Sequence, residues 1–475
     1  MTTDFDRMKP LTAADIQNIH AKTVDVLVGT GLWVESAAAR EIYQKHGLKV
    51  DGEIVYFNEK VIEDAIKSAP EKFTVKARNP EFDLVVGGDS YAFAPSGGSP
   101  LFMEFSGEQR RATKEDCIDF LKITQYFDVL RFNRAVVSPS DIPSDNVSLW
   151  QLVSALKYTD KSVNAGDELT LELLLIAFGI DMDKLREDGR KGIYYGLGGI
   201  NPVSPLSLTA LQSDRLIFMA ENYIPNIVAT MPTAGMSAPC TIPGLLVTQN
   251  CENLGPIILS QLVNPGAPVI YGTIGTITDM KTGGAPIGVP EARIIEKASA
   301  QIARSYGIPT RGDCGLTDSL CCDFQAGVES ALQFYNVIRS GIHLIPGCGE
   351  LGSWMHGSLE KLVLDCEVAE YVTRIVRPLE VNEETMAVDV IEKVGPRGSY
   401  LTELHTLKNF RKEFYHPFLF NRGNYDNWAK EGRLEAKDRA HAKVEDILKN
   451  YERPALDRSL EKDIDKYVEA NWPVK

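Results

Sequence analysis

The sequence has no apolar run approaching the ~20 residues that span a bilayer, and Met1 to Pro10 lack the apolar core of a signal peptide. Its eight cysteines are scattered, without the density of a secreted disulfide framework. The formal net charge is -15, and the basic runs that a nucleic-acid-binding face requires are missing. We therefore expect a cytoplasmic protein with reduced thiols and with neither a membrane nor a nucleic acid as partner.

Common catalytic signatures are also missing. The chain contains no G-x-x-x-x-G-K-[ST] loop, no H-E-x-x-H and no G-x-S-x-G. A G-x-G-x-x-G match at Gly347–Gly352 follows the last predicted strand, whereas a dinucleotide fold places it in the first βα unit. We therefore expect no bound nucleotide.

Four cysteines cluster near the ends of the last two predicted strands, and thiolates can hold zinc. They are Cys314, Cys321, Cys322 and Cys348. No C-x-x-C pair and no histidine at ligand spacing accompany them, which favours small buried thiols over a metal centre. We expect no bound metal.

What the chain does contain is a repeated unit, in which a short apolar run leads into a stretch of helical periodicity. The predicted strands are Tyr91–Pro95, Val129–Ser138, Ser162–Gly166, Gly192–Gly198, Ile227–Pro232, Pro268–Thr273, Ile308–Arg311 and Gly341–Pro346. The predicted helices are Lys114–Phe127, Val147–Tyr158, Glu168–Phe178, Leu206–Glu221, Gly244–Leu262, Pro290–Tyr306, Asp323–Arg339 and Ser358–Val376. Eight such units over about 290 residues predict a (β/α)8 TIM barrel of the α/β class.

The barrel is expected to occupy residues 91–380, between two additions. Residues 1–90 read as an N-terminal α+β lead-in, with strands near Glu53–Phe57 and Phe73–Ala77 around a helix at Glu59–Ser68. Residues 381–475 read as a C-terminal helical extension that ends in amphipathic helices at Ala436–Tyr451 and Leu460–Ala470. A helical extension of this kind can act as a dimer arm, so we expect a homo-oligomer.

The active site of a TIM barrel lies where the strands end. Small residues are frequent there, which indicates either close approach of a bulky group to the backbone or ordinary turn glycines. The expected rim residues are Gly97, Gly98, Gly199, Asn201, Thr233, Thr273 and Gly347. Arg311 ends the seventh strand and could bind a substrate carboxylate, or could instead form an ion pair with Asp313. Glu350 follows the eighth strand in the same rim.

Aromatic side chains on or just after the strands could hold a quaternary ammonium through cation–π attraction, although an aromatic at such a position more often fills the core. They are Phe93, Tyr195, Tyr271, Trp354 and, with them, His356.

Three stretches resemble the trimethylamine methyltransferase superfamily. They are Leu11 to His20 with the lead-in up to Gly31, Ala77-Arg78-Asn79-Pro80 followed by Gly97-Gly98-Ser99-Pro100, and Gly315-Leu316-Thr317-Asp318-Ser319 with Asp323-Phe324-Gln325-Ala326-Gly327. The resemblance implies a TIM barrel whose mouth faces a corrinoid protein and an enzyme that transfers a methyl group from an amine to Co(I).

The founding trimethylamine enzymes carry pyrrolysine near the seventh strand, whereas Asp318 to Asp323 here are ordinary residues. Pyrrolysine-free relatives use betaines such as glycine betaine, proline betaine, carnitine or γ-butyrobetaine. A quaternary ammonium already leaves as a neutral amine, so no activating residue and no general base is required. The resemblance therefore implies a betaine:corrinoid protein methyltransferase, with Arg311 as the expected carboxylate anchor.

Two details refine this expectation. Many relatives have a histidine where this chain has Pro346, which implies a different betaine if that histidine contacts substrate. The chain lacks the D-x-H-x-x-G signature of cobalamin-carrying domains, so the corrinoid is expected on a partner protein. Alternatives left open are a TIM-barrel lyase or aldolase acting on a small carboxylate, a methyltransferase with folate as acceptor, and a non-catalytic betaine-binding protein.

Overall fold

A parallel sheet forms the centre of the computed structural model, which describes residues 7–472. Its order is β10-β12-β14-β16-β17-β6, and every neighbouring pair is parallel. The strands are β6 (Ala92–Pro95), β10 (Gly198–Ile200), β12 (Asn226–Thr230), β14 (Val269–Thr273), β16 (Thr310–Arg311) and β17 (Leu344–Cys348). These six strands form a half-barrel.

The second and third predicted strands are not regular strands. Their segments make isolated parallel bridges, Phe93 with Leu130, Phe132 with Ser162 and Asn164 with Leu197. A ladder requires consecutive pairs, and these segments supply only single pairs. The expectation of eight regular strands was therefore wrong for these two segments.

The fourth predicted strand, Gly192–Gly198, is divided. Its start forms β9 (Ile193–Tyr194), which pairs with β4 (Lys72–Val75) of the N-terminal region, and its end enters β10. The division follows from pairing with two different sheets, which a single apolar run in the sequence does not reveal.

The helices that follow the strands agree with the expected ranges to within four residues at either end. They are α4 (Lys114–Tyr126), α5 (Val147–Tyr158), α6 (Glu168–Phe178), α8 (Ala210–Glu221), α9 (Ile242–Val263), α10 (Pro290–Ser305), α11 (Phe324–Ser340) and α12 (Leu359–Val376). Local capping explains several starts: Thr113 and Asp116 form a capping box on α4, and Asp167 and Thr170 form one on α6. An additional short helix, α7 (Met182–Gly189), precedes β9.

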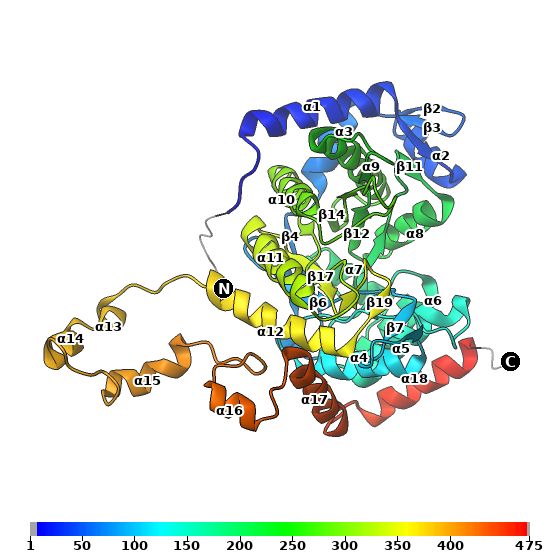
Figure 1. Cartoon of the computed structure of the whole chain (residues 1–475). Coiled ribbons are helices and arrows are strands. Elements are labelled where there is room, and N and C mark those ends of the chain that lie inside the picture. The colour runs from blue at the N-terminus through cyan, green and yellow to red at the C-terminus, as the bar shows by residue number, and fades with distance from the viewer. Residues whose placement is uncertain (1–6, 473–475) are drawn as a thin grey trace.

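The N-terminal region packs on the outside of this core. It contains α1 (Ala13–Gly29), β1 (Leu32–Val34), α2 (Ala37–Lys45), β2 (Lys49–Asp51), β3 (Ile54–Tyr56), α3 (Glu59–Ser68) and β5 (Leu84–Gly87). Helices α1, α2 and α3 all pack on α9, and β1 pairs with β11 (Ser207–Leu208), which lies far away in the sequence. The region is thus joined to the central sheet through α9, β9 and β11 (Figure 1).

Short strands lie in the loops at the carboxyl ends of the parallel strands. They are β7 (Leu101–Met103), β8 (Gln109–Arg111), β13 (Thr233–Ala234), β15 (Thr276–Ile277), β18 (Glu350–Leu351) and β19 (His356–Gly357). Their pairings, β18-β19-β7-β8 and β13-β15, tie neighbouring loops of the rim together.

The C-terminal region is helical. It contains α13 (Glu383–Met386), α14 (Val388–Val394), α15 (Leu404–Glu413), α16 (Tyr425–Lys430), α17 (Ala436–Lys449) and α18 (Arg458–Asn471). Helix α17 packs on α12 and α4, and α18 packs on α6, whereas α13, α14 and α15 project away from the body (Figure 1). No helix among residues 7–472 is both long and apolar enough to cross a membrane.

Candidate functional site

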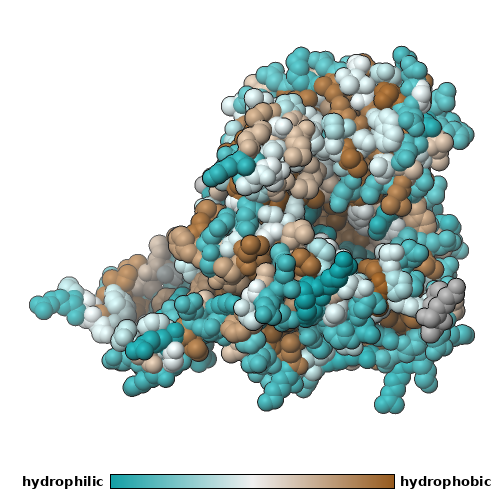
Figure 2. Space-filling model, turned by 45° about the vertical axis from the view of Figure 1, so that its right-hand side comes forward, coloured by the Kyte–Doolittle hydropathy of each residue, from teal (hydrophilic) through white to brown (hydrophobic). Residues whose placement is uncertain are grey.

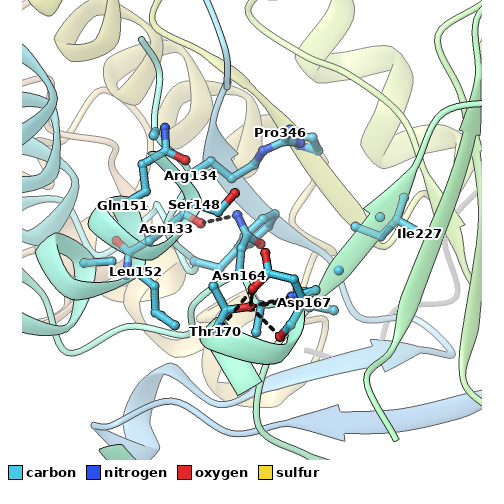
Figure 3. Close-up of a pocket in the computed structure, with 18 of the residues that line it drawn as sticks. Asn133, Arg134, Ser148, Gln151, Leu152, Asn164, Asp167, Thr170, Ile227 and Pro346 are labelled. Carbon is cyan, nitrogen blue, oxygen red and sulfur yellow. Dashed lines mark hydrogen bonds between the residues drawn. The ribbon is translucent and has the colours of Figure 1, made fainter. Parts of the chain in front are cut away.

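A cavity of about 350 Å³ opens at the carboxyl ends of the parallel strands. Residues that follow successive strand segments line it, together with side chains from α5, α6 and α8 (Figure 3). The polar or charged lining residues include Asn133, Arg134, Ser148, Gln151, Asn164, Asp167, Thr170, Asn201, Arg215 and Arg311. Its position is where TIM-barrel enzymes place their active sites.

Two arginines that line the cavity, Arg134 and Arg215, have no hydrogen-bond or ion-pair partner among residues 7–472, and Arg134 is the more buried of the two. Its guanidinium forms no hydrogen bond and no ion pair with any residue between 7 and 472. Burial, and next the neighbouring charge of Arg311, lowers the pKa of Arg134 to about 10, so the side chain is still a cation at neutral pH. An unpaired guanidinium that lines a cavity is a ready binding group for a carboxylate.

Gly97 provides the space for this guanidinium. A Cβ atom at Gly97 would lie 3.2 Å from both Nε and Nη2 of Arg134 and 3.3 Å from the carbonyl oxygen of Ala135. The absence of a side chain at position 97 therefore allows Arg134 to lie across the backbone. Gly98, beside it, is exposed, and a Cβ there would meet nothing within 4 Å.

Arg311 also lines the cavity, but its charge is already compensated. Its Nη1 and Nη2 donate to the two carboxylate oxygens of Asp313 at 2.7 and 2.5 Å, and Nη1 also donates to the carbonyl oxygen of Thr273. The network continues behind the cavity, where the backbone N–H of Asp313 donates to Glu296, which pairs with Arg293 at 2.7 Å. Arg311 is thus held rigidly and has little charge to offer a ligand.

Glu350 is a second buried charge near Arg134. It accepts hydrogen bonds from the hydroxyls of Ser96, at 2.5 Å, and Ser99. Burial raises the pKa of Glu350 to about 7, although these two hydrogen bonds and the charge of Arg134 oppose the rise. The electrostatic environment of Arg134 therefore changes near neutral pH.

Helix α5 contributes three side chains with polar atoms to the lining that make no hydrogen bond within residues 7–472, Ser148, Trp150 and Gln151. By contrast, Asn164 donates to the backbone oxygen of Asn133, and Asp167 and Thr170 are engaged in the cap of α6. Figure 3 shows Asn133, Ser148 and Gln151 on one side of the cavity and Ile227 and Pro346 on the other. The indole of Trp150 and the amide of Gln151 are thus free to meet a ligand.

The aromatic residues expected to form a cation cage lie elsewhere. Phe93 packs on Phe334 with ring centroids 5.2 Å apart. Tyr195 packs on Phe178 and donates to Asp188, and the hydroxyl of Tyr271 donates to Asn250 of α9. These three side chains contact helix residues, Phe334 of α11, Phe178 of α6 and Asn250 of α9.

Trp354 and His356 are also outside the main cavity. Trp354 borders a separate hollow of about 10 Å³ with Asp313, and the Nε2 of His356 lies 2.6 Å from Oε1 of Gln109. Of the expected substrate-binding set, only Arg311 lines the main cavity, with Asp313 hydrogen-bonded behind it.

The expected rim residues have different environments. Gly199 and Asn201 line the cavity, whereas Thr233 and Thr273 are buried, and the Thr273 hydroxyl donates to Gln249 at 2.6 Å. At Gly347, with φ +134°, a Cβ would lie 2.0 Å from the carbonyl oxygen of Cys314. Gly347 is therefore required for packing between β16 and β17 and not for the approach of a ligand.

The four clustered cysteines do not converge on one point. The Sγ atoms of Cys314 and Cys348 are 3.9 Å apart and buried, whereas Cys321 is exposed. Residues 7–472 contain no group of three or more His, Cys, Asp or Glu side chains arranged to hold a metal.

Sequence reasoning missed Arg134, Trp150 and Gln151. A signal was present in one case, because Asn133-Arg134 interrupts the otherwise largely apolar run of the second predicted strand. The predicted end of that strand, Ser138, directed attention four residues too far along the chain. No comparable signal identifies the two α5 residues, whose placement depends on how the helix packs.

Known proteins that are similar to this chain are methyltransferases. A sequence model of the family described as trimethylamine methyltransferase (MTTB) matches residues 1–471. The chain is 37% identical to a glycine betaine methyltransferase of Desulfitobacterium hafniense, over 96% of each chain. It is 31% identical to a proline betaine:corrinoid methyltransferase of Eubacterium limosum, over 97% of each chain. A crystal structure of the Methanosarcina barkeri monomethylamine methyltransferase matches with a TM-score of 0.53 at 11% identity, over 94% of this chain and 90% of the other.

Proposed function

The chain belongs to the trimethylamine methyltransferase (MTTB) family, and we propose that it transfers a methyl group from a small betaine to the corrinoid of a separate protein. The observation that carries this proposal is the unpaired guanidinium of Arg134 in the cavity at the strand ends. Two relatives are named for betaine substrates, which supports the same substrate class.

Arg134 takes the role of carboxylate anchor that the sequence suggested for Arg311. A substrate carboxylate would gain a charge-assisted, bidentate interaction with Arg134, whereas Arg311 already gives its two terminal nitrogens to Asp313. Arg311, fixed by its pair with Asp313 behind it, then forms a rigid part of the cavity wall. Since a 350 Å³ cavity exceeds the volume of glycine betaine, larger betaines also fit.

The onium end of the substrate needs an apolar, electron-rich surface and no general base. Trp150 supplies an aromatic face in the same cavity, and the indole is the best aromatic partner for a cation. Holding the carboxylate at Arg134 and the onium near Trp150 fixes the orientation of the substrate, which lowers the entropic cost of the transfer. In that transfer the N–CH3 bond breaks, its electron pair stays on nitrogen, and a neutral tertiary amine leaves.

The corrinoid supplies the Co(I) nucleophile that accepts the methyl group. The surface around the cavity suits a docked protein, because exposed apolar side chains are carried on four adjacent rim loops. These are Met236, Met280, Leu320 and Met355. The loops are bonded to one another: Gly352 N–H donates to Ser319, and Asp318 accepts from Ile287 and Ser353. Such a patch is typical of a protein interaction site.

The proposal includes closure of the central sheet. Isolated parallel bridges link β6 to Leu130, Phe132 to Ser162 and Asn164 to Leu197, directly before β10. The edge strands of the six-stranded sheet are β6 and β10. The three bridges connect them in turn through the second and third predicted strand segments. We therefore describe the domain, residues 91–380, as a closed but irregular (β/α)8 barrel, flanked by residues 1–90 and 381–475.

The test is a product assay with betaine carrying three deuterated N-methyl groups, reduced cobalamin and the purified chain. The expected products are the tertiary amine with two labelled methyl groups and cobalamin carrying the third. Stoichiometric betaine binding without any demethylated amine, with free cobalamin and with corrinoid proteins, would contradict the proposal and support a binding protein instead.

A further inference from the structure

Helices α13, α14 and α15 belong to an arm, residues 379–414, that projects from the body of the protein (Figure 1). None of the three helices contains a buried residue. The hydrogen bonds between the arm and the rest of residues 7–472 are made at its root, where Arg374 and Arg377 donate to the carbonyl oxygens of Glu413 and Lys412. Helices this short are not stable in water without packing.

The arm is nevertheless rich in large apolar side chains. Leu379 and Leu401 are both 83% exposed. The other exposed apolar residues of the arm are Val381, Met386, Val388, Ile391, Tyr400, Leu404, Leu407 and Phe414. Figure 2 shows brown, hydrophobic patches among hydrophilic residues on the projecting segment. An exposed set of this kind marks a surface that is covered by a partner.

A matching surface lies on the body. Phe324, Val328 and Leu332 are 87%, 40% and 60% exposed and are spaced four residues apart, so they form one stripe along α11. Ile375, near the end of α12, is 57% exposed. Helices α11 and α12 pack together, on the side of the body from which the arm departs (Figure 1).

We propose that two copies of this chain form a dimer in which the arm of each copy packs on the α11 stripe of the other. Every chain carries both surfaces, so a two-fold axis that sets each arm on the stripe of the other chain buries both arms and both stripes in one reciprocal interface. The exposed apolar side chains of the arm alone amount to on the order of 1,000 Å², compared with ~800 Å² buried per partner in a typical stable complex.

The position of the arm argues for a second copy and against the corrinoid protein as its partner. Helix α12 follows β17, so it begins at the mouth of the cavity and runs antiparallel to the strands. Its C-terminal end, from which the arm departs, therefore lies at the opposite end of the sheet from the mouth. Helix α11 follows β16 and likewise begins at the mouth, so the stripe runs from Phe324 at the mouth toward the end of the sheet from which the arm departs. A protein docked at the mouth lies near Phe324 but not near the root of the arm, so it would leave the arm uncovered.

The experiment uses two full-length variants. One carries Leu404→Lys and Leu407→Lys in the arm, and the other carries Val328→Glu and Leu332→Glu in the stripe. We expect the unmodified chain to have the mass of a dimer by light scattering, and each variant alone to be monomeric at concentrations tenfold above the dissociation point of the unmodified chain. Circular dichroism confirms that the variants are folded. A control with Thr402→Glu and Lys408→Glu, two exposed polar positions of the arm, should stay dimeric.

Mixing the two monomeric variants tests whether the arm of one copy packs on the stripe of the other. In a mixed dimer, one arm and one stripe retain their unmodified residues, and the altered arm meets the altered stripe with opposite charge. We therefore expect the mixture to form dimers at a dissociation constant at least tenfold below that of either variant alone. A monomeric unmodified chain, variants that remain dimeric, or a mixture that remains monomeric would each overturn the proposal.

Discussion

The guanidinium of Arg311 donates to both carboxylate oxygens of Asp313, at 2.7 and 2.5 Å, and Arg311 lines the cavity with Asp313 behind it. From the sequence, Arg311 could bind a substrate carboxylate or pair with Asp313, and the family resemblance favours the carboxylate. The structure shows the pair with Asp313 and leaves Arg134 unpaired in the same cavity.

Arg134→Gln should raise the KM for a betaine by about 30- to 100-fold, because the substrate carboxylate loses a partly buried charged partner worth about 2–3 kcal/mol. Steady-state kinetics of betaine-dependent cobalamin methylation measures this. The matched control is Arg190→Gln, an exposed arginine that ends α7 and makes no side-chain hydrogen bond within residues 7–472. An unchanged KM in Arg134→Gln would remove Arg134 from the binding site.

Gly97→Ala should displace the guanidinium without unfolding the chain. The added Cβ would meet Nε and Nη2 of Arg134 at 3.2 Å, which requires a shift of a few tenths of an ångström. Since bidentate binding depends on geometry, we expect KM to rise about three- to tenfold with little change in kcat. Gly327→Ala on α11 is the control, because its Cβ would meet nothing within 4 Å. Equal KM values for the two variants would show that the space at Gly97 does not position the guanidinium of Arg134 for binding.

The affinity for betaine should fall as the pH rises through about 7. Burial raises the pKa of Glu350 to about 7, so this carboxyl is largely neutral below that pH and ionised above it. The ionised form offers Arg134 a competing negative charge, whereas the neutral form leaves the guanidinium to the substrate. KM measured from pH 6 to pH 8 should therefore increase in the unmodified chain. Glu350→Gln should have a flat profile at the low value, and a profile that keeps the same slope would exclude Glu350 as its source.

Arg311→Met should lower the free energy of unfolding by about 3–5 kcal/mol, because it leaves the buried carboxylate of Asp313 without its partner. Urea denaturation measures the loss. The double variant Arg311→Met with Asp313→Leu removes both charges and should lose less stability than the single variant. A double variant that is less stable than Arg311→Met alone would show that Asp313 has a structural role independent of Arg311.

The helices could be predicted from the sequence, because apolar periodicity and capping residues such as Thr113 and Asp116 are local signals. The strands could be predicted only in part. Short buried segments such as the one around Leu130 carry no information on whether they form a ladder or a single bridge. Tyr271 was expected to face the substrate and faces α9 instead, since a strand that is apolar on both faces does not reveal its inward side. Arg134 was missed for a related reason: residues 132–135 line the cavity, whereas the predicted strand ends only at Ser138.

The most direct test of the central proposal is the absorbance of Co(I) cobalamin in the presence of the purified chain, with glycine betaine, proline betaine, carnitine, γ-butyrobetaine and trimethylamine added separately. Loss of the Co(I) spectrum with at least one betaine, but not with trimethylamine, is the predicted result, because trimethylamine offers no carboxylate to Arg134. Loss with trimethylamine alone, or no loss with any betaine even when corrinoid proteins replace free cobalamin, would contradict a betaine methyltransferase anchored at Arg134.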